Sequence, residues 1–165
     1  MDLLKGVKSE LSCFKSGFAL LLGGVGAMLE LIVMVACGNF YIYKLLLMPR
    51  HAPPPLLFFA AVLLFFTLLG YTLGLICEYM KRCKALTALL FGIMTMVFSL
   101  LWYISFFKTA ALIFGLFMLI MALLLTLMTV RECLRIGVLP TAFAGLCGLG
   151  LLFFLWLTFS AAILN

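Results

Sequence analysis

The stretch PPPLLFFAAVLLFFTLLGYTLGLICEYMKRCK (residues 53–84) decides the fold. Three prolines open it, residues 56–77 carry no Lys, Arg, Asp or Glu, and a basic cluster closes it. A helix of about 20 apolar residues crosses the hydrocarbon core of a bilayer, so this run is long enough to span a membrane. Proline is favoured in the first turn of a helix and cannot continue one, so Pro55 is predicted to start the span.

Similar runs fill most of the remaining chain. Apolar residues make up 68% of the 165 residues and charged residues 10%, whereas soluble domains are about 45–50% apolar. Backbone groups in lipid must be satisfied within the chain, and the alternation of barrel strands is absent. The sequence therefore predicts an all-α integral membrane bundle, a single domain over residues 1–165. The five expected transmembrane helices cover about residues 16–43, 56–77, 85–107, 109–130 and 138–164.

The connections between these spans are short, apart from the first loop at residues 44–55. Short connections force neighbouring helices to run antiparallel, as in one compact bundle. The first loop contains four of the five prolines and the single histidine. Glycine at both ends of GYTLG (residues 70–74) lets backbones approach, so Gly70 and Gly74 are predicted to form a helix contact or a dimer face.

Basic residues predict the orientation. The N-terminal tail and the connections after the second and fourth spans hold eight Lys or Arg residues, and the opposite side holds three. By the positive-inside rule, the N-terminus is cytoplasmic and the C-terminus lies outside. The net charge of +6 is interpreted as this topology signal and not as a sign of nucleic-acid binding. The first apolar run is long enough to remain as a span, so no cleaved signal peptide is expected.

Conventional catalytic patterns are absent from the sequence. It has one Asp (Asp2) and one His (His51), with no Ser-His-Asp, HExxH or phosphate-loop arrangement. Its six cysteines form no CxxC pair, so we interpret them as reduced thiols among apolar residues. We therefore predict no enzyme, no metal site and no required cofactor.

Glu30 and the aromatic residues near Trp102 are separate candidates. A carboxyl group inside a span is costly, so Glu30 is a candidate proton or ion contact. Alternatively it is neutral, or it lies near the membrane surface because the long first span tilts. Trp102, Tyr103, Phe106 and Phe107 end the third span, where we expect an interfacial aromatic belt on the side of the first loop.

Several motifs resemble the translocator protein, or tryptophan-rich sensory protein, family (TspO/MBR), whose members have five transmembrane helices. The segment YKLLLMPRHAPPPLLFFAAVLLFFTLLGY (residues 43–71) is similar to the first loop and second helix of the family. The matching positions there are Tyr43, Pro49, Pro53, Pro54, Phe58 and Gly70. Trp102, Phe106 and Phe107 match a Trp-x-x-x-Phe-Phe motif at the end of the third helix, and Arg135 matches a basic residue after the fourth.

Some family positions differ in this chain. His51 replaces the loop tryptophan and Val62 replaces the tryptophan of the second helix. In the fifth helix, an ungapped comparison places Gly150 at the family tryptophan and Thr158 at an asparagine, while Ser99 is nearest to an asparagine of the third helix. Light-dependent porphyrin breakdown in some bacterial members is attributed to tryptophans, so its absence is expected here.

The resemblance implies a pocket that opens toward the first loop and takes porphyrins, sterols or synthetic aromatic ligands. The ligand-binding residues it implies are Pro49, Arg50, His51, Pro53, Pro54, Phe58, Phe59, Val62, Trp102 and Phe107. The loop prolines would fix the lid, the rings would stack on the ligand, and Arg50 or His51 would meet its polar edge or a haem-like metal centre.

Three functions follow as hypotheses. The first is binding, and transport or sensing, of a tetrapyrrole (porphyrin) or sterol-type ligand by a homodimer in the lipid bilayer. The second is a proton- or ion-coupled transporter of a small solute that uses Glu30. The third is a structural assembly subunit. Flux that depends on Glu30 would favour the second, and a tight partner protein without a ligand would favour the third.

Overall fold

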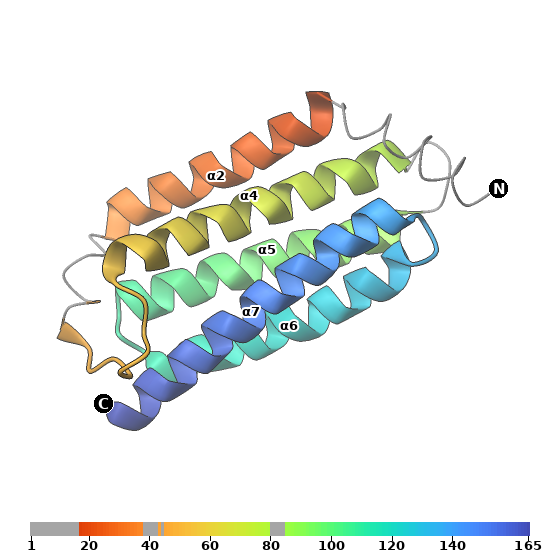
Figure 1. Cartoon of the computed structure of the whole chain (residues 1–165). Helices are drawn as coiled ribbons and strands as arrows, with labels where there is room; N and C mark the ends of the chain where they lie inside the picture. Colours follow the sequence, from red (N-terminus) through yellow and green to blue (C-terminus); the bar gives the residue numbers. More distant parts are fainter. Residues whose placement is uncertain (1–16, 38–42, 44, 80–84) are drawn as a thin grey trace.

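A computed structural model describes residues 17–37, 43, 45–79 and 85–165. All long elements in these residues are helices, and each is long and apolar enough to cross a membrane. Figure 1 shows them side by side as one bundle. The helices are α2 (Gly17–Cys37), α4 (Pro55–Tyr79), α5 (Leu86–Phe107), α6 (Leu112–Cys133) and α7 (Val138–Leu164). The prediction of an all-α bundle of five transmembrane helices is confirmed.

The helix boundaries follow local backbone rules. Pro55 is the first residue of α4, as predicted. The Phe58 amide donates to the Pro54 carbonyl at 3.0 Å, which is the first hydrogen bond of the helix. The fourth helix differs from the charge-free run at 109–130. Ala110, in the turn after α5, has a left-handed φ of 50° that a helix cannot include, so α6 starts only after it, at Leu112, and continues to Cys133. The predicted end of the first span lies outside the described residues, apart from Tyr43.

The helices follow one another around the bundle in the order α2, α4, α7, α6, α5. Each neighbouring pair in this series is packed together, and α5 closes the ring by contacting both α4 and α2. The first loop, the α5–α6 turn and the end of α7 therefore share one end of the bundle (Figure 1). This arrangement brings residues of α4, α5 and α7 to a common interior below the first loop.

Glycines allow α2 and α4 to touch backbone to backbone. A Cβ atom on Gly26 would overlap the Phe66 carbonyl oxygen, and one on Gly74 would overlap Ala19. Gly70 has the same close approach to α2. The contact predicted for Gly70 and Gly74 is therefore a contact within the chain.

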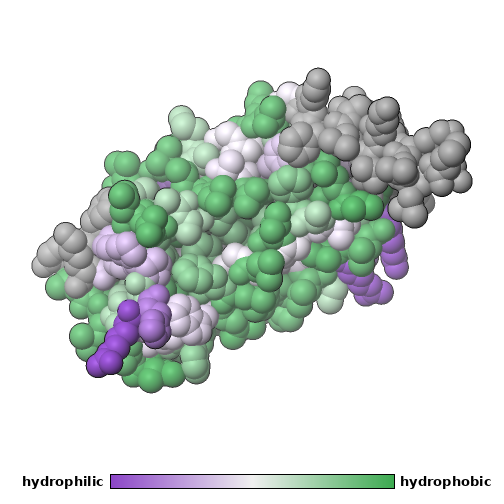
Figure 2. Space-filling model, in the orientation of Figure 1, coloured by the Kyte–Doolittle hydropathy of each residue, from purple (hydrophilic) through white to green (hydrophobic). Residues whose placement is uncertain are grey.

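The outer surface matches a lipid environment. Large apolar side chains on the outside of the helices are exposed, such as Val35 and Ile113 at more than four-fifths of their area. Figure 2 shows hydrophobic residues covering the long face, with hydrophilic residues at the two ends. The chain is therefore an integral, multi-pass membrane protein.

Candidate functional site

An aromatic cluster fills the interior at the end of the bundle that carries the first loop. We define it by eight side chains that are at most 5% exposed: Tyr43, Phe58, Phe59, Trp102, Tyr103, Phe106, Phe107 and Phe154. Four of the implied ligand-binding residues, Phe58, Phe59, Trp102 and Phe107, belong to it. Val62, a fifth, is fully buried on α4 in the same core. The structure thus brings together the implied residues of the second and third spans.

Ring contacts join the three helices within the cluster. The Phe107 ring of α5 lies 5.7 Å from Phe58 and 5.4 Å from Phe59 on α4, measured between centroids. Phe154 of α7 lies 5.9 Å from Phe58 and stacks on Trp102 at 5.0 Å, with 28° between their planes. Such pairs contribute about 0.5–1.5 kcal/mol each beyond the burial of their area. The rings are therefore packed against one another as a closed core.

The prediction of an interfacial aromatic belt at the end of the third span is wrong. Trp102, Tyr103, Phe106 and Phe107 are completely buried, because these residues of α5 meet the neighbouring helices and not lipid. A tryptophan with an exposed ring is found instead on α7, where 44% of Trp156 is exposed.

Sequence reasoning also missed Phe154. This ring contacts both Trp102 and Phe58, although it is not among the ligand-binding residues that the resemblance implies. The signal was a helical stripe in α7, whose buried residues include Cys147, Leu151, Phe154, Thr158 and Ala161. Almost every residue around this stripe is apolar too, so the sequence did not separate its buried side from its lipid side.

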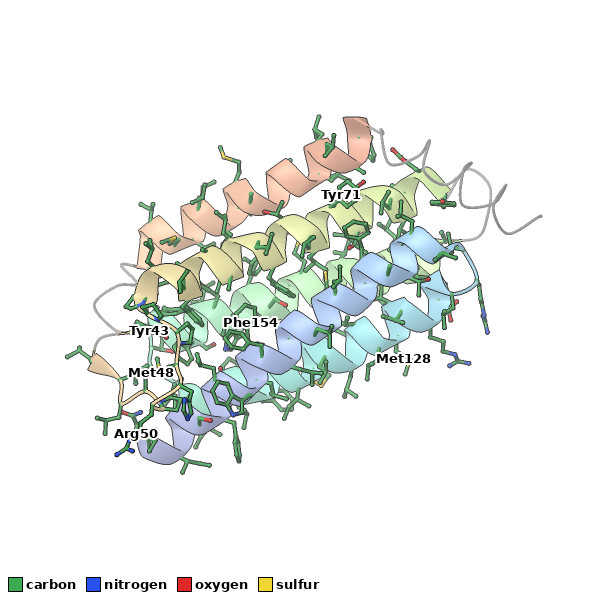
Figure 3. All side chains as sticks on the ribbon, viewed as in Figure 1. Tyr43, Met48, Arg50, Tyr71, Met128 and Phe154 are labelled. Atoms are coloured by element: carbon green, nitrogen blue, oxygen red, sulfur yellow. The ribbon has the colours of Figure 1, made fainter. Side chains whose placement is uncertain are left out.

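The first loop covers the cluster with apolar side chains. Leu46, Met48 and Ala52 pack against it, and Figure 3 shows Met48 near Tyr43 at this end of the bundle. The Tyr43 hydroxyl donates to the Pro53 carbonyl at 2.7 Å. Burial of this phenol raises the pKa of Tyr43. The hydrogen bond fixes the proline segment over the rings.

A second attachment holds the other part of the loop. The Asn165 side-chain amide accepts from the Leu47 backbone N–H and donates to the Leu47 carbonyl, both at 3.1 Å. Arg50 and His51 are exposed, and Figure 3 shows Arg50 at the outer edge of this end. They thus lie outside the core, whereas Leu46, Met48 and Ala52 of the same loop pack against it. Pro49 forms a turn under them by accepting from the Ala52 amide at 2.8 Å.

The fold agrees with one comparison to known proteins. The model of the TspO/MBR family matches residues 17–165, nearly the whole chain. The chain belongs to the TspO/MBR family. It is accordingly a membrane protein of the ligand-binding or transport type. No curated protein sequence matches it.

Membership in TspO/MBR makes the departures at the tryptophan positions informative. At Gly150, which the ungapped comparison set against a family tryptophan, the Phe65 ring of α4 lies 3.1 Å from where a Cβ atom would be. Phe65 in turn contacts Phe154 edge to face at 5.5 Å. Thr158 of α7 accepts a hydrogen bond from the Trp102 indole N–H at 3.1 Å. This hydrogen bond joins α5 to α7 in the interior.

Glu30 lies in the interior of this TspO/MBR bundle. It is 1% exposed and sits about two turns before the end of α2. Its carboxyl group faces the Tyr103 hydroxyl of α5, but neither carboxyl oxygen has a hydrogen bond of regular geometry among the described residues. It is therefore a buried acid next to the aromatic cluster.

Proposed function

We propose that this protein binds a flat apolar ligand of tetrapyrrole or sterol type in the aromatic cluster below the first loop. The observation that carries the proposal is the convergence of Phe58, Phe59, Trp102 and Phe107 under a loop that is fastened at two points. Aromatic faces of this kind give large contact area to planar ligands. Membership in the TspO/MBR family supports a ligand-binding or transport role for the protein.

Ligand entry then requires two movements. The rings contact each other directly, so a planar ligand must part those of α4 and α5. The loop must also lift, which breaks the hydrogen bonds at Pro53 and Leu47. Arg50 and His51, exposed on the lifted loop, can then contact carboxylates at the edge of a porphyrin. Pro49 and Pro54 restrict how far the loop bends.

Titration of protoporphyrin into purified protein tests the proposal. The double variant Trp102→Ala, Phe107→Ala removes two rings of the cluster, and the expected result is at least a tenfold weaker Kd. Trp156→Ala is the matched control, because this tryptophan is 44% exposed on the outside of α7. Equal affinity of the double variant and the control would refute the assignment of the site.

We propose binding without catalysis. Val62 and Gly150 occupy positions where a redox-active indole stands in relatives to which porphyrin breakdown is attributed. Under illumination, the visible absorbance of porphyrin bound to the protein is expected to fall at the same rate as that of free porphyrin in the same detergent. A protein-dependent loss of absorbance would contradict this part.

We also propose that the N-terminus is cytoplasmic, based on the positive-inside rule. In addition, we propose that the protein forms a homodimer. Gly70 and Gly74 are used inside the chain, so the dimer must form through another lipid-facing surface. Reporter fusions at both ends test the orientation, and light scattering of the detergent-solubilised protein measures the oligomeric state. A periplasmic or lumenal N-terminus, or a monomeric mass, would contradict the respective statement.

A further inference from the structure

Two buried polar side chains beside the aromatic cluster make no hydrogen bond of regular geometry within the described part of the chain. They are Glu30, through both carboxyl oxygens, and Ser99, through its hydroxyl. Glu30 is 1% exposed and Ser99 is fully buried. Buried polar groups are nearly always satisfied in native proteins, so each exception needs a physical reason.

Other hydroxyls in the same interior show the usual solution. The following side chains each donate to the carbonyl four residues earlier in their own helix: Thr72, Thr95, Ser105, Thr126 and Thr129. Ser99 is on α5, between Thr95 and Ser105, and does not make this bond. Its hydroxyl thus remains available to another partner, although neighbouring hydroxyls of α5 bond to carbonyls of their own helix.

The two groups lie next to the candidate site. Glu30 faces the Tyr103 hydroxyl, and the Tyr103 ring contacts Phe107 of the cluster at 4.6 Å. Val33 and Met34, about one turn further along α2, pack against the cluster as well. Ser99 is one turn from Tyr103 on α5. Glu30 therefore borders the cluster at Tyr103, and Ser99 lies one turn away on the face of α5 that carries Tyr103.

We propose that Glu30 and Ser99 form a polar subsite that accepts an O–H or N–H donor carried by the apolar ligand. This inference rests on the proposed function and specifies its ligand class. A carboxyl group has an acceptor oxygen whether or not it is protonated, and a serine hydroxyl also accepts. A ligand carboxylate brings no donor at neutral pH. The subsite thus favours a polycyclic alcohol or amine over a molecule with a carboxylate at that end.

Two matched probes test the donor requirement. Dehydroergosterol is a fluorescent sterol with one hydroxyl, and its 3-methyl ether keeps the rings but has no donor. Wild-type protein in detergent is expected to bind the alcohol about tenfold more tightly than the ether, the effect of one buried hydrogen bond. Glu30→Leu should bind both equally, whereas Glu30→Gln should keep most of the preference because an amide oxygen still accepts.

Further variants keep the test decisive. Glu132→Gln removes an acid that pairs with Arg135 at the other end of the bundle, at 3.3 Å, and should leave the preference unchanged. Ser99→Ala should reduce the preference severalfold, and it serves as the second variant if Glu30→Leu does not fold. Equal affinity of wild-type protein for alcohol and ether would overturn the subsite while leaving the aromatic site intact. Failure of both sterols and of protoporphyrin to bind would overturn the proposed function and this inference together.

Discussion

Replacing Gly70 with alanine tests how α2 is held in the bundle. The new Cβ atom would lie 3.1 Å from the Leu22 carbonyl carbon and 3.3 Å from the Gly23 Cα, and closer still to the Leu22 oxygen. All three atoms are backbone of α2, so no side-chain rotation relieves the overlap. The two helices must move apart along their contact.

The expected loss of stability follows from the contacts that attach α2 to the bundle. Its buried residues are Ala19, Gly23, Gly26 and Glu30, so it is attached mainly by close backbone packing and not by large interlocking side chains. Overpacking a tight contact costs about 1–3 kcal/mol. A loss of about 2 kcal/mol in a chain of this length lowers the Tm by about 4–8 °C.

Thermal unfolding in detergent, followed by circular dichroism, measures this effect. Gly24→Ala is the matched control, because a Cβ atom on Gly24 meets nothing within 4 Å and alanine has the higher helix propensity. The control is expected to melt at the wild-type temperature or slightly above it. If Gly70→Ala melts with the control, close packing of the two backbones does not hold α2, and the reasoning is refuted.

Three smaller predictions concern the cluster and its loop. Asn165→Ala removes both side-chain hydrogen bonds to the loop backbone, so limited proteolysis should cleave the first loop several times faster than in wild type. Burial raises the pKa of Tyr43, so the stability from its neutral, hydrogen-bonded form is present below the ordinary value of about 10 and falls as pH rises above it. Alkaline melting curves should show a larger loss in wild type than in Tyr43→Phe, which cannot donate to Pro53. Thr158→Val leaves the Trp102 indole N–H without its acceptor and should cost about 1–3 kcal/mol, whereas Thr158→Ser should restore most of the stability measured by thermal melting.

The sequence alone was sufficient for the helix count and the fold class. Long charge-free runs between short charged clusters leave few structures in a bilayer besides helices, since every backbone group must be paired within the chain. Pro55 marked the start of α4 correctly, because proline acts on the backbone locally. The start of α6 was predicted too early because the left-handed residue before it is Ala110. Alanine rarely adopts this conformation, so the sequence gives no sign of it.

The site residues could be foreseen from the motif resemblance but not from their physical properties. Phe58, Trp102 and Phe107 come together as the motifs imply. Phe154 was missed, and Trp102 was assigned to an interfacial belt although it is completely buried. In a soluble protein, polarity separates the two sides of a helix, but here lipid-facing and core-facing side chains are equally apolar.

What the sequence by itself determined is thus the number of spans, their approximate limits and the place of the first loop. Only the tertiary structure decided which face of each helix is inside. It also decided that Gly70 and Gly74 pack against α2 and that Glu30 is enclosed beside Tyr103. The physical reason is that hydrophobicity drives helices into the membrane but does not choose between lipid and another helix. That choice depends on close packing and on pairing of the few polar groups, which exist only once the helices are assembled.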